Sequence, residues 1–135
     1  MHNEALYKVK IYYEDTDSGG VVYYANYLKF LERARSEMIY STGLTNNKLL
    51  SDHGVFIIVK SCKIDYKSPA KFEDTLTIKS KVKSITKTSF VIEQIIERNS
   101  SMITYAELIL VIVNKNGKPT KIPEELENSL KKFLS

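Results

Sequence analysis

The stretch Tyr13-Glu14-Asp15-Thr16-Asp17-Ser18-Gly19-Gly20 lies between a segment with strand-like alternation and a long amphipathic segment with helical periodicity. It places the carboxylate of Asp17 just ahead of two glycines and a predicted helix N-terminus. Glycine lets the backbone approach a ligand closely because it has no Cβ. The first N–H groups of a helix lack intrahelical acceptors and carry partial positive charge, so they favour an anion or a carbonyl that becomes one. This junction is a candidate site for acyl transfer, although Asp17 could equally serve only as an acceptor of turn or cap hydrogen bonds.

Length and composition are typical of one globular domain. The chain has 135 residues, of which 43% are hydrophobic and 27% charged, and we expect a single domain over residues 1–135. The N-terminal residues form no apolar signal-peptide core, and no apolar run is long enough to span a bilayer, so we expect a cytoplasmic protein. The formal net charge of +4 is spread along the chain, which argues only weakly for nucleic acid and would equally suit a phosphate-bearing small substrate.

The hydrophobic pattern predicts a long helix lying across an antiparallel sheet. We expect strands at residues 6–15, 55–66, 75–84, 88–98 and 102–114, and helices at 23–42 and from about Pro123. The apolar repeat predicts an inner helix face formed by Leu28, Leu31, Ala34, Arg35 and Met38. Long strands with short connections are typical of antiparallel sheets, and one long helix can cover one face. The other face and both edges would stay uncovered, so we expect the chain to associate with copies of itself.

From Tyr13 to Glu37 the sequence follows the pattern Y-x-x-T-D-x-G-G-V-V-Y-x-A-N-Y-L-x-F-x-E-R-A-R-x-E. This pattern resembles the hotdog-fold acyl-CoA thioesterases, specifically the YbgC-like branch of the 4-hydroxybenzoyl-CoA thioesterase family. Weaker matches are residues 64–70 with Asp74 just beyond, and residues 119–123. The resemblance implies an α+β hotdog fold, in which an antiparallel five-stranded sheet wraps a long central helix and a short C-terminal helix follows. It also implies homodimers or homotetramers with active sites at the subunit interface. No metal or organic cofactor is implied, since coenzyme A is part of the substrate.

The resemblance further implies roles for individual residues. Asp17 would be the catalytic carboxylate, either as nucleophile or as general base on water. The backbone N–H of Tyr24 would form the oxyanion hole, and Tyr13 would be a hydrogen-bonding support. The residues expected to bind substrate are Gly20, Val22, Tyr23 and Tyr27. The last of these could equally be core packing.

Tyr24 departs from the family pattern, because many members of this branch have histidine at this position. Histidine can relay a proton near neutral pH, whereas tyrosine mostly donates a hydrogen bond. Asp17 and a backbone oxyanion donor would survive the change, but a proton relay would not. The expected activity is hydrolysis of an acyl-CoA thioester to free acid and CoA. The alternative is a non-catalytic hotdog module, linked to envelope or lipid biogenesis, that binds acyl-CoA or acyl-carrier protein. A dehydratase is disfavoured because its histidine is missing from this motif.

Other residues with chemical potential have simpler interpretations. Residues 15–20 resemble the start of a calcium loop, but Gly19 and Asn26 stand where ligand oxygens are needed. One cysteine and two histidines show no metal-ligand spacing, and His2 at the terminus is expected to be mobile. We expect Cys62 to be a buried filler on the strand face shared by Phe56, Ile58 and Ile64, and His53 to be an exposed loop residue. Lys79, Lys81 and Lys83 are expected to form a solvated strand face, with CoA phosphate binding as the less favoured alternative.

Overall fold

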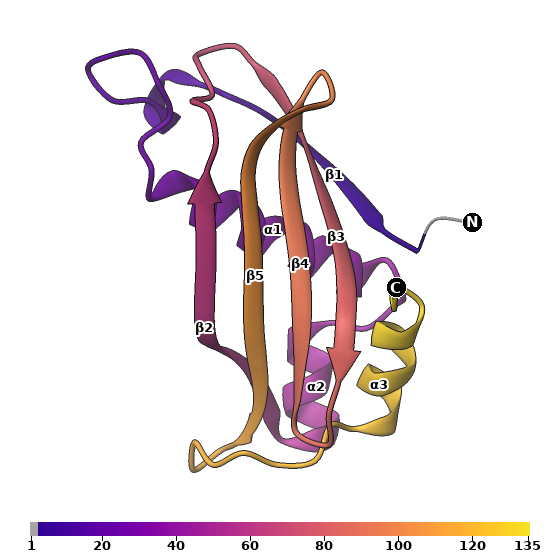
Figure 1. Ribbon diagram of the computed structural model, residues 1–135. Coiled ribbons are helices and arrows are strands. Elements are labelled where there is room, and N and C mark those ends of the chain that lie inside the picture. The colour runs from indigo at the N-terminus through magenta and orange to yellow at the C-terminus, as the bar shows by residue number, and fades with distance from the viewer. Residues whose placement is uncertain (1–2) are drawn as a thin grey trace.

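A computed structural model describes residues 3–135, which form a five-stranded antiparallel sheet and three α-helices (Figure 1). His2 lies outside the described residues. The strands are β1 (Ala5–Lys10), β2 (Val55–Tyr66), β3 (Thr75–Ile85), β4 (Ser89–Arg98) and β5 (Ser101–Asn114). The helices are α1 (Asn26–Tyr40), α2 (Asn46–His53) and α3 (Glu124–Lys131). The strand order is β1-β3-β4-β5-β2, so β1 and β2 are the edges. Within residues 3–135, no helix is both long and apolar enough to cross a membrane.

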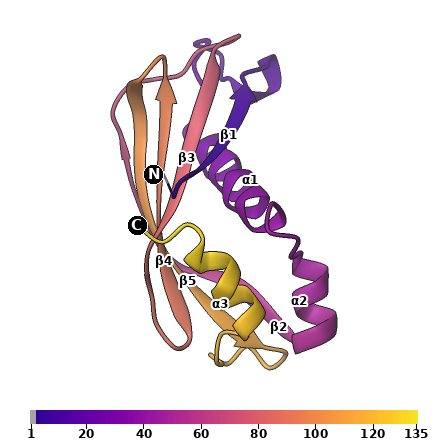
Figure 2. The same ribbon diagram turned by 90° about the vertical axis from the view of Figure 1, so that its right-hand side faces the viewer.

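All three helices lie on one side of the sheet, and α1 runs across its inner face (Figures 1 and 2). The buried residues of α1 recur at three- and four-residue spacing. They are Tyr27, Phe30, Leu31, Ala34, Met38 and Ile39. Leu28 does not belong to this face: it is 44% exposed, so that part of the prediction is wrong. The buried face of α1 is centred on Tyr27 and Leu31, and the Leu28 position lies just outside this face.

A buried polar link joins α1 to the middle of the sheet. The side-chain amide of Gln94 on β4 donates hydrogen bonds of 2.9 Å to the Leu31 carbonyl oxygen and to the Ser80 hydroxyl on β3. Gln94 and Ser80 are both at most 1% exposed. Hydrogen bonds to buried polar groups are costly to lose, so this link fixes where α1 lies along the strands.

The outer face of β3, β4 and β5 is covered by cross-strand ion pairs. Lys79 pairs with Glu97 at 2.9 Å, Lys81 with Glu93 at 3.3 Å, and Lys83 with Glu107 at 3.2 Å. The predicted alternation of β3 is therefore confirmed, with Leu76, Ile78 and Val82 buried. Because each of these three lysines already has a carboxylate partner, the structure favours the solvated strand face over a CoA phosphate site there.

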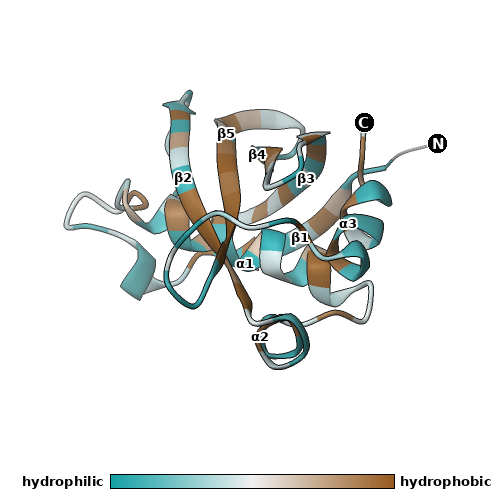
Figure 3. Ribbon diagram, turned by 90° about the horizontal axis from the view of Figure 1, so that it is seen from below, coloured by the Kyte–Doolittle hydropathy of each residue, from teal (hydrophilic) through white to brown (hydrophobic). Residues whose placement is uncertain are grey.

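The edge strand β2 carries apolar side chains that remain exposed. Phe56 and Ile58 are 42% and 46% exposed, whereas β5 beside them is hydrophobic over much of its length (Figure 3). The pairing of β2 with β5 shifts between Val59 and Ser61. This bulge moves Cys62 to the opposite face from Phe56 and Ile58. Cys62 is also exposed, so its prediction as a buried filler is wrong: no strand covers it at this edge.

Two connections differ from the sequence prediction. Strand β1 ends at Lys10 rather than at residue 15, and the chain enters a 3₁₀ turn at Tyr13–Asp15. The Tyr12 N–H donates to Asp15 Oδ2 at 2.9 Å and the Asp15 N–H returns to the Tyr12 carbonyl oxygen, which closes this turn.

The predicted polar connection after α1 instead contains α2, which is capped by Thr45 at its start and by Gly54 with φ +65° at its end. His53 therefore ends a helix, although it is exposed as expected; its Nε2 lies 3.4 Å from Glu125 Oε1.

Candidate active site

Asp17 lies in a tight hairpin loop that precedes α1. The Asp17 N–H donates to the Val21 carbonyl oxygen at 2.9 Å, and the Gly20 N–H donates to the Asp17 carbonyl oxygen at 3.1 Å. Gly20 has φ +81°, a conformation that favours glycine. Thr16 and Val22 form an isolated antiparallel bridge at the base of the loop. The loop is thus a defined turn that holds Asp17 at its first corner.

The Asp17 carboxylate is exposed and held by one oxygen. Its Oδ1 accepts the Gly19 N–H at 2.8 Å. Its Oδ2 accepts no hydrogen bond from any group in residues 3–135. A cap role is wrong, because α1 begins only at Asn26 and its N-cap is Ala25. The carboxylate is oriented by the turn and still presents a free oxygen.

The segment leading into α1 leaves the backbone N–H of Tyr24 available. The Tyr23 N–H donates to the Asp15 carbonyl oxygen at 3.0 Å, and the Asn26 N–H donates to the Tyr23 carbonyl oxygen at 2.8 Å. Within the described part of the chain, neither the Tyr24 N–H nor the Ala25 N–H that follows it has an acceptor. Tyr24 precedes the helix rather than lying in it as predicted, since residues 23–25 form a turn. An N–H of this kind is a potential oxyanion donor.

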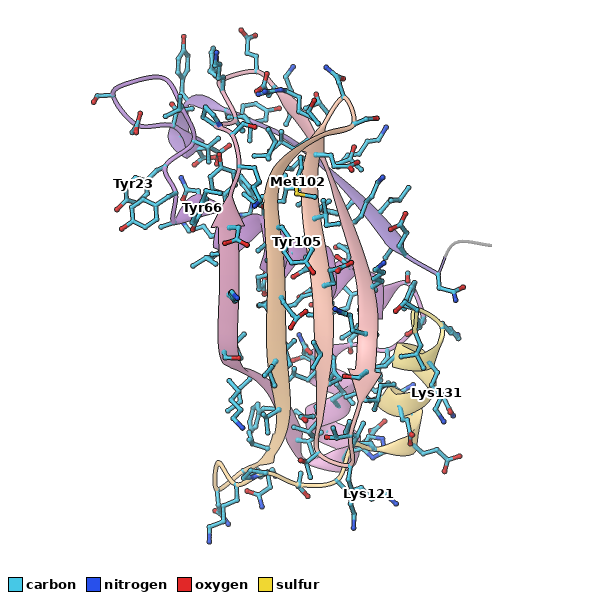
Figure 4. The ribbon with its side chains drawn as sticks, viewed as in Figure 1. Tyr23, Tyr66, Met102, Tyr105, Lys121 and Lys131 are labelled. Atoms are coloured by element: carbon cyan, nitrogen blue, oxygen red, sulfur yellow. The ribbon has the colours of Figure 1, made fainter. Side chains whose placement is uncertain are left out.

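Aromatic side chains surround a shallow cavity of about 300 Å³ beside this segment. It is lined by Val22, Tyr24, Tyr27, Tyr66, Lys67, Ser68 and Pro69. The Tyr66 ring lies 5.6 Å from the Tyr27 ring and 6.4 Å from the Tyr24 ring, measured between centroids. Figure 4 shows Tyr66 at the end of β2 near Tyr23. Tyr23 is 46% exposed, and its ring is tilted by 46° against that of Tyr24 with 4.8 Å between centroids. Tyr66 was not predicted as a site residue, although it belongs to the second motif at residues 64–70.

Tyr27 combines the two interpretations that the sequence left open. It is 3% exposed and packs edge-on against Phe30, so it is a core residue. It also lines the cavity, and its hydroxyl accepts the Ala70 N–H at 3.0 Å. Burial raises the pKa of the Tyr27 hydroxyl. The Tyr27 side chain therefore lines the cavity as a neutral phenol.

Tyr13 and Gly20 fix the loop onto the segment before β3. The Tyr13 ring is 76% exposed and stacks on Phe72, with 3.9 Å between centroids and 16° between planes. The hydrogen bonds of Tyr13 come from its carbonyl oxygen, which accepts from the N–H and the hydroxyl of Thr16. The Gly20 carbonyl oxygen accepts the Phe72 N–H at 3.4 Å. Tyr13 therefore supports the loop by stacking and through its backbone, and its predicted side-chain hydrogen bond to the site remains a prediction.

Asp74 anchors that segment. Its Oδ2 accepts the Lys71 N–H at 2.8 Å and the Arg98 guanidinium at 2.7 Å. Partial burial acts to raise the pKa of Asp74, but these two donors outweigh it and hold the pKa below its ordinary value. No group of three His, Cys, Asp or Glu side chains within residues 3–135 is placed to hold a metal ion.

The Asp17 carboxylate is exposed and held through one oxygen, and the chain after its loop carries the Tyr24 N–H and the aromatic cavity, although Asp17 itself does not line that cavity. A carboxylate and a backbone N–H donor are the groups that acyl-transfer hydrolysis uses. The described fold around it is an α-helix crossing one face of an antiparallel sheet. The chain belongs to the thioesterase-like superfamily, whose family model matches residues 12–130. The hotdog fold and the YbgC-like relationship predicted from the sequence motif are confirmed.

Individual relatives agree with this assignment. The chain is 36% identical to the acyl-CoA thioesterase YbgC of Haemophilus influenzae over 128 residues, which cover 94% of each protein. It is 35% identical to the acyl-CoA thioester hydrolase YbgC of Escherichia coli, with 92% of this chain and 95% of that protein covered. Among solved structures, a probable thioesterase from Bartonella henselae superimposes with a TM-score of 0.85 at 35% identity, covering 89% of this chain and 99% of that one.

Proposed function

We propose that this protein hydrolyses an acyl-CoA thioester to the free acid and CoA. The observation that carries the proposal is the Asp17 carboxylate, which is held through Oδ1 by the Gly19 N–H with Oδ2 free, on the loop that leads into the segment with the unpartnered N–H of Tyr24. The names of the YbgC relatives support the same activity.

The reaction has two routes through Asp17. As nucleophile, an Asp17 oxygen attacks the thioester carbonyl, the CoA thiolate leaves, and water hydrolyses the resulting mixed anhydride. As general base, Asp17 takes a proton from the water that attacks the same carbonyl; the C–S bond then breaks and the CoA thiolate leaves, to be protonated to the thiol. In both routes negative charge develops on the carbonyl oxygen, which the Tyr24 N–H stabilises. Loss of one such donor costs about 2.7–4 kcal/mol in well-studied enzymes.

The cavity bounded by Val22, Tyr27 and Tyr66 is the proposed acyl site. Its apolar ring faces suit an acyl group, and the Tyr24 side chain at its rim can donate a hydrogen bond where related proteins have histidine. Gly20 and Tyr23 do not line this cavity, and their predicted role in binding substrate remains a prediction. The reaction as written needs no further cofactor.

We further propose that the active form is a homodimer or homotetramer. The exposed apolar residues of the unpaired β2 edge support this, since such an edge tends to pair with another chain. A second copy beside β2 would also cover the open side of the cavity, which Tyr66 at the end of β2 lines. A single domain over residues 1–135 and a cytoplasmic location remain predictions.

The decisive experiment follows CoA release with a thiol reagent over a panel of acyl-CoA thioesters. The Asp17→Asn variant should lose at least about 10³-fold in kcat while keeping its circular dichroism and oligomeric state. Asp52→Asn, an exposed aspartate on α2, is the matched control and should be fully active. Full activity in Asp17→Asn would eliminate the proposed mechanism. Measurable acyl-CoA affinity in the wild type, with turnover no better than buffer, would instead establish the binding module.

A further inference from the structure

We propose that the groove between β1 and α1 binds the nucleotide end of coenzyme A, with its phosphates on Lys8, Lys10, Lys29 and Arg33 and its adenine on Tyr12. This groove has a volume of about 460 Å³ and is separate from the aromatic cavity. The inference rests on the proposed function, because that function makes a CoA thioester the substrate.

Four basic residues from two elements line this groove. Lys8 and Lys10 are two residues apart on β1 and pair with Thr77 and Thr75, so both lie on the outer face of the strand and line the groove from the free edge of the sheet. Lys29 and Arg33 are four residues apart on α1 and so lie on the same face of the helix. All are exposed, and within residues 3–135 none has a carboxylate oxygen within ion-pair distance. This differs from the outer sheet face, where Lys79, Lys81 and Lys83 each have one.

Two carboxylates also line the groove, but they do not cancel these charges. Asp15 uses its Oδ2 to accept the Tyr12 N–H at 2.9 Å, so this oxygen belongs to the 3₁₀ turn. Glu14 makes no ion pair with any cation in the described residues. The cations outnumber the carboxylates two to one, which favours an anionic ligand with several charges. Phosphate suits this set because both lysine and arginine donate charge-assisted hydrogen bonds to its oxygens.

Tyr12 adds an aromatic surface to the same groove. Its side chain is 60% exposed. Nucleobases stack on exposed aromatic rings, and a basic groove with an aromatic platform is a common arrangement for nucleotides. Guarding the free edge of β1 against strand pairing would explain Lys8 and Lys10, but not Lys29, Arg33 or Tyr12.

The groove adjoins the proposed oxyanion site through shared backbone. Asp15 and Asn26 line the groove, and the Asp15 carbonyl oxygen accepts both the Tyr23 N–H at 3.0 Å and the Asn26 side-chain amide at 2.9 Å. Tyr24 lies between these two donors in the chain. CoA carries its phosphates at the opposite end of the pantetheine arm from the thioester. A phosphate site must therefore adjoin the acyl site without coinciding with it, as this groove does.

The test compares an acyl-CoA with the N-acetylcysteamine thioester of the same acid, which lacks the nucleotide. In the Lys29→Glu/Arg33→Glu variant we expect KM for the acyl-CoA to rise about tenfold or more, with kcat and all constants for the short thioester unchanged. The matched control is Lys118→Glu/Lys121→Glu, which makes the same charge change at exposed positions; Lys121 lies at the far end of the molecule from Tyr23 (Figure 4). The control should match the wild type. Calorimetry with adenosine 3′,5′-bisphosphate should show binding to the wild type and control and none to the variant.

The possible outcomes separate this inference from the proposed function. An equal rise in KM for both thioesters, or no rise in KM for the acyl-CoA, would overturn the proposal that this groove binds the nucleotide. A loss confined to acyl-carrier protein as substrate would assign the groove to a protein partner instead and would also overturn it. If the wild type hydrolyses neither thioester, the proposed function fails, whereas the bisphosphate titration still decides the groove.

Discussion

Gly19 and Gly20 stand next to each other in the Asp17 loop, but the structure requires glycine at the two positions for different reasons. A Cβ at Gly19 would lie 3.2 Å from Asp17 Oδ1, whereas its backbone is not in the left-handed region. A Cβ at Gly20 would meet nothing within 4 Å, but φ there is +81°. One position is therefore limited by the carboxylate and the other by backbone strain.

The two alanine substitutions should separate catalysis from stability. In Gly19→Ala the carboxylate must move by a few tenths of an ångström. Since a displacement of 1 Å costs about 10²-fold in rate, we expect kcat to fall about 3- to 10-fold with little change in thermal stability. In Gly20→Ala a left-handed alanine costs about 1–2 kcal/mol, which for a chain of this size lowers the unfolding temperature by about 3–8 °C.

Steady-state thioester hydrolysis and thermal unfolding by circular dichroism, measured on both variants, check this expectation. Gly20→Ala is assayed well below its unfolding temperature, so that its kcat reports on the folded loop. A fully active Gly19→Ala variant would show that Asp17 Oδ1 is not held where catalysis needs it. An unchanged unfolding temperature in Gly20→Ala would refute the assignment of strain to that residue.

Three further substitutions test the support of the site and of the core. Asp74→Asn should lower the free energy of unfolding by about 1–2 kcal/mol at neutral pH. The pKa of Asp74 is lower in the folded than in the unfolded protein. The extra free energy of unfolding that Asp74 gives the wild type is therefore fully present above the ordinary pKa of about 3.9 and is lost as the pH falls through the folded-state pKa. Urea unfolding of both proteins across this pH range measures the difference. Gln94→Leu should cost about 1–3 kcal/mol by leaving the buried Ser80 hydroxyl without its partner, and adding Ser80→Ala should restore part of the loss in the same urea assay. Tyr27→Phe removes the acceptor of a buried backbone N–H and should cost a similar amount, together with a fall in kcat.

The main elements of the fold could be predicted from the sequence because their periodicity is strong. β3 alternates between buried apolar and outward lysine residues as expected, and β2 has the predicted bounds. The failures lie where tertiary contacts decide. Leu28 fits a helical apolar repeat but misses the buried face, and a one-residue bulge that no local pattern signals turns Cys62 to the other face of β2.

The sequence motif supplies the candidate site residues, whereas their local geometry could not be predicted from it. The motif identified Asp17 and Tyr24, and the expected helix start at residue 23 placed both at a helix N-terminus. Residues 23–25 instead form a turn, since Tyr23 and Asn26 bond to the Asp15 carbonyl oxygen. Only the tertiary structure shows that this turn leaves the N–H groups of Tyr24 and Ala25 without an acceptor in the described residues.

The second motif, at residues 64–70 with Asp74, has no chemistry of its own, and the contacts of the Asp17 loop explain it. The Val22 N–H donates to the Ala70 carbonyl oxygen at 2.8 Å, and the Phe72 N–H donates to that of Gly20. Asp74 in turn holds this segment through Arg98, and Tyr66 forms a wall of the cavity. The loop that carries the carboxylate is therefore fixed mainly by a non-helical segment about fifty residues further along the chain. This is why a substitution at Asp74, which contacts neither the loop carboxylate nor the cavity, should weaken catalysis as well as folding: the position of Asp17 depends on it.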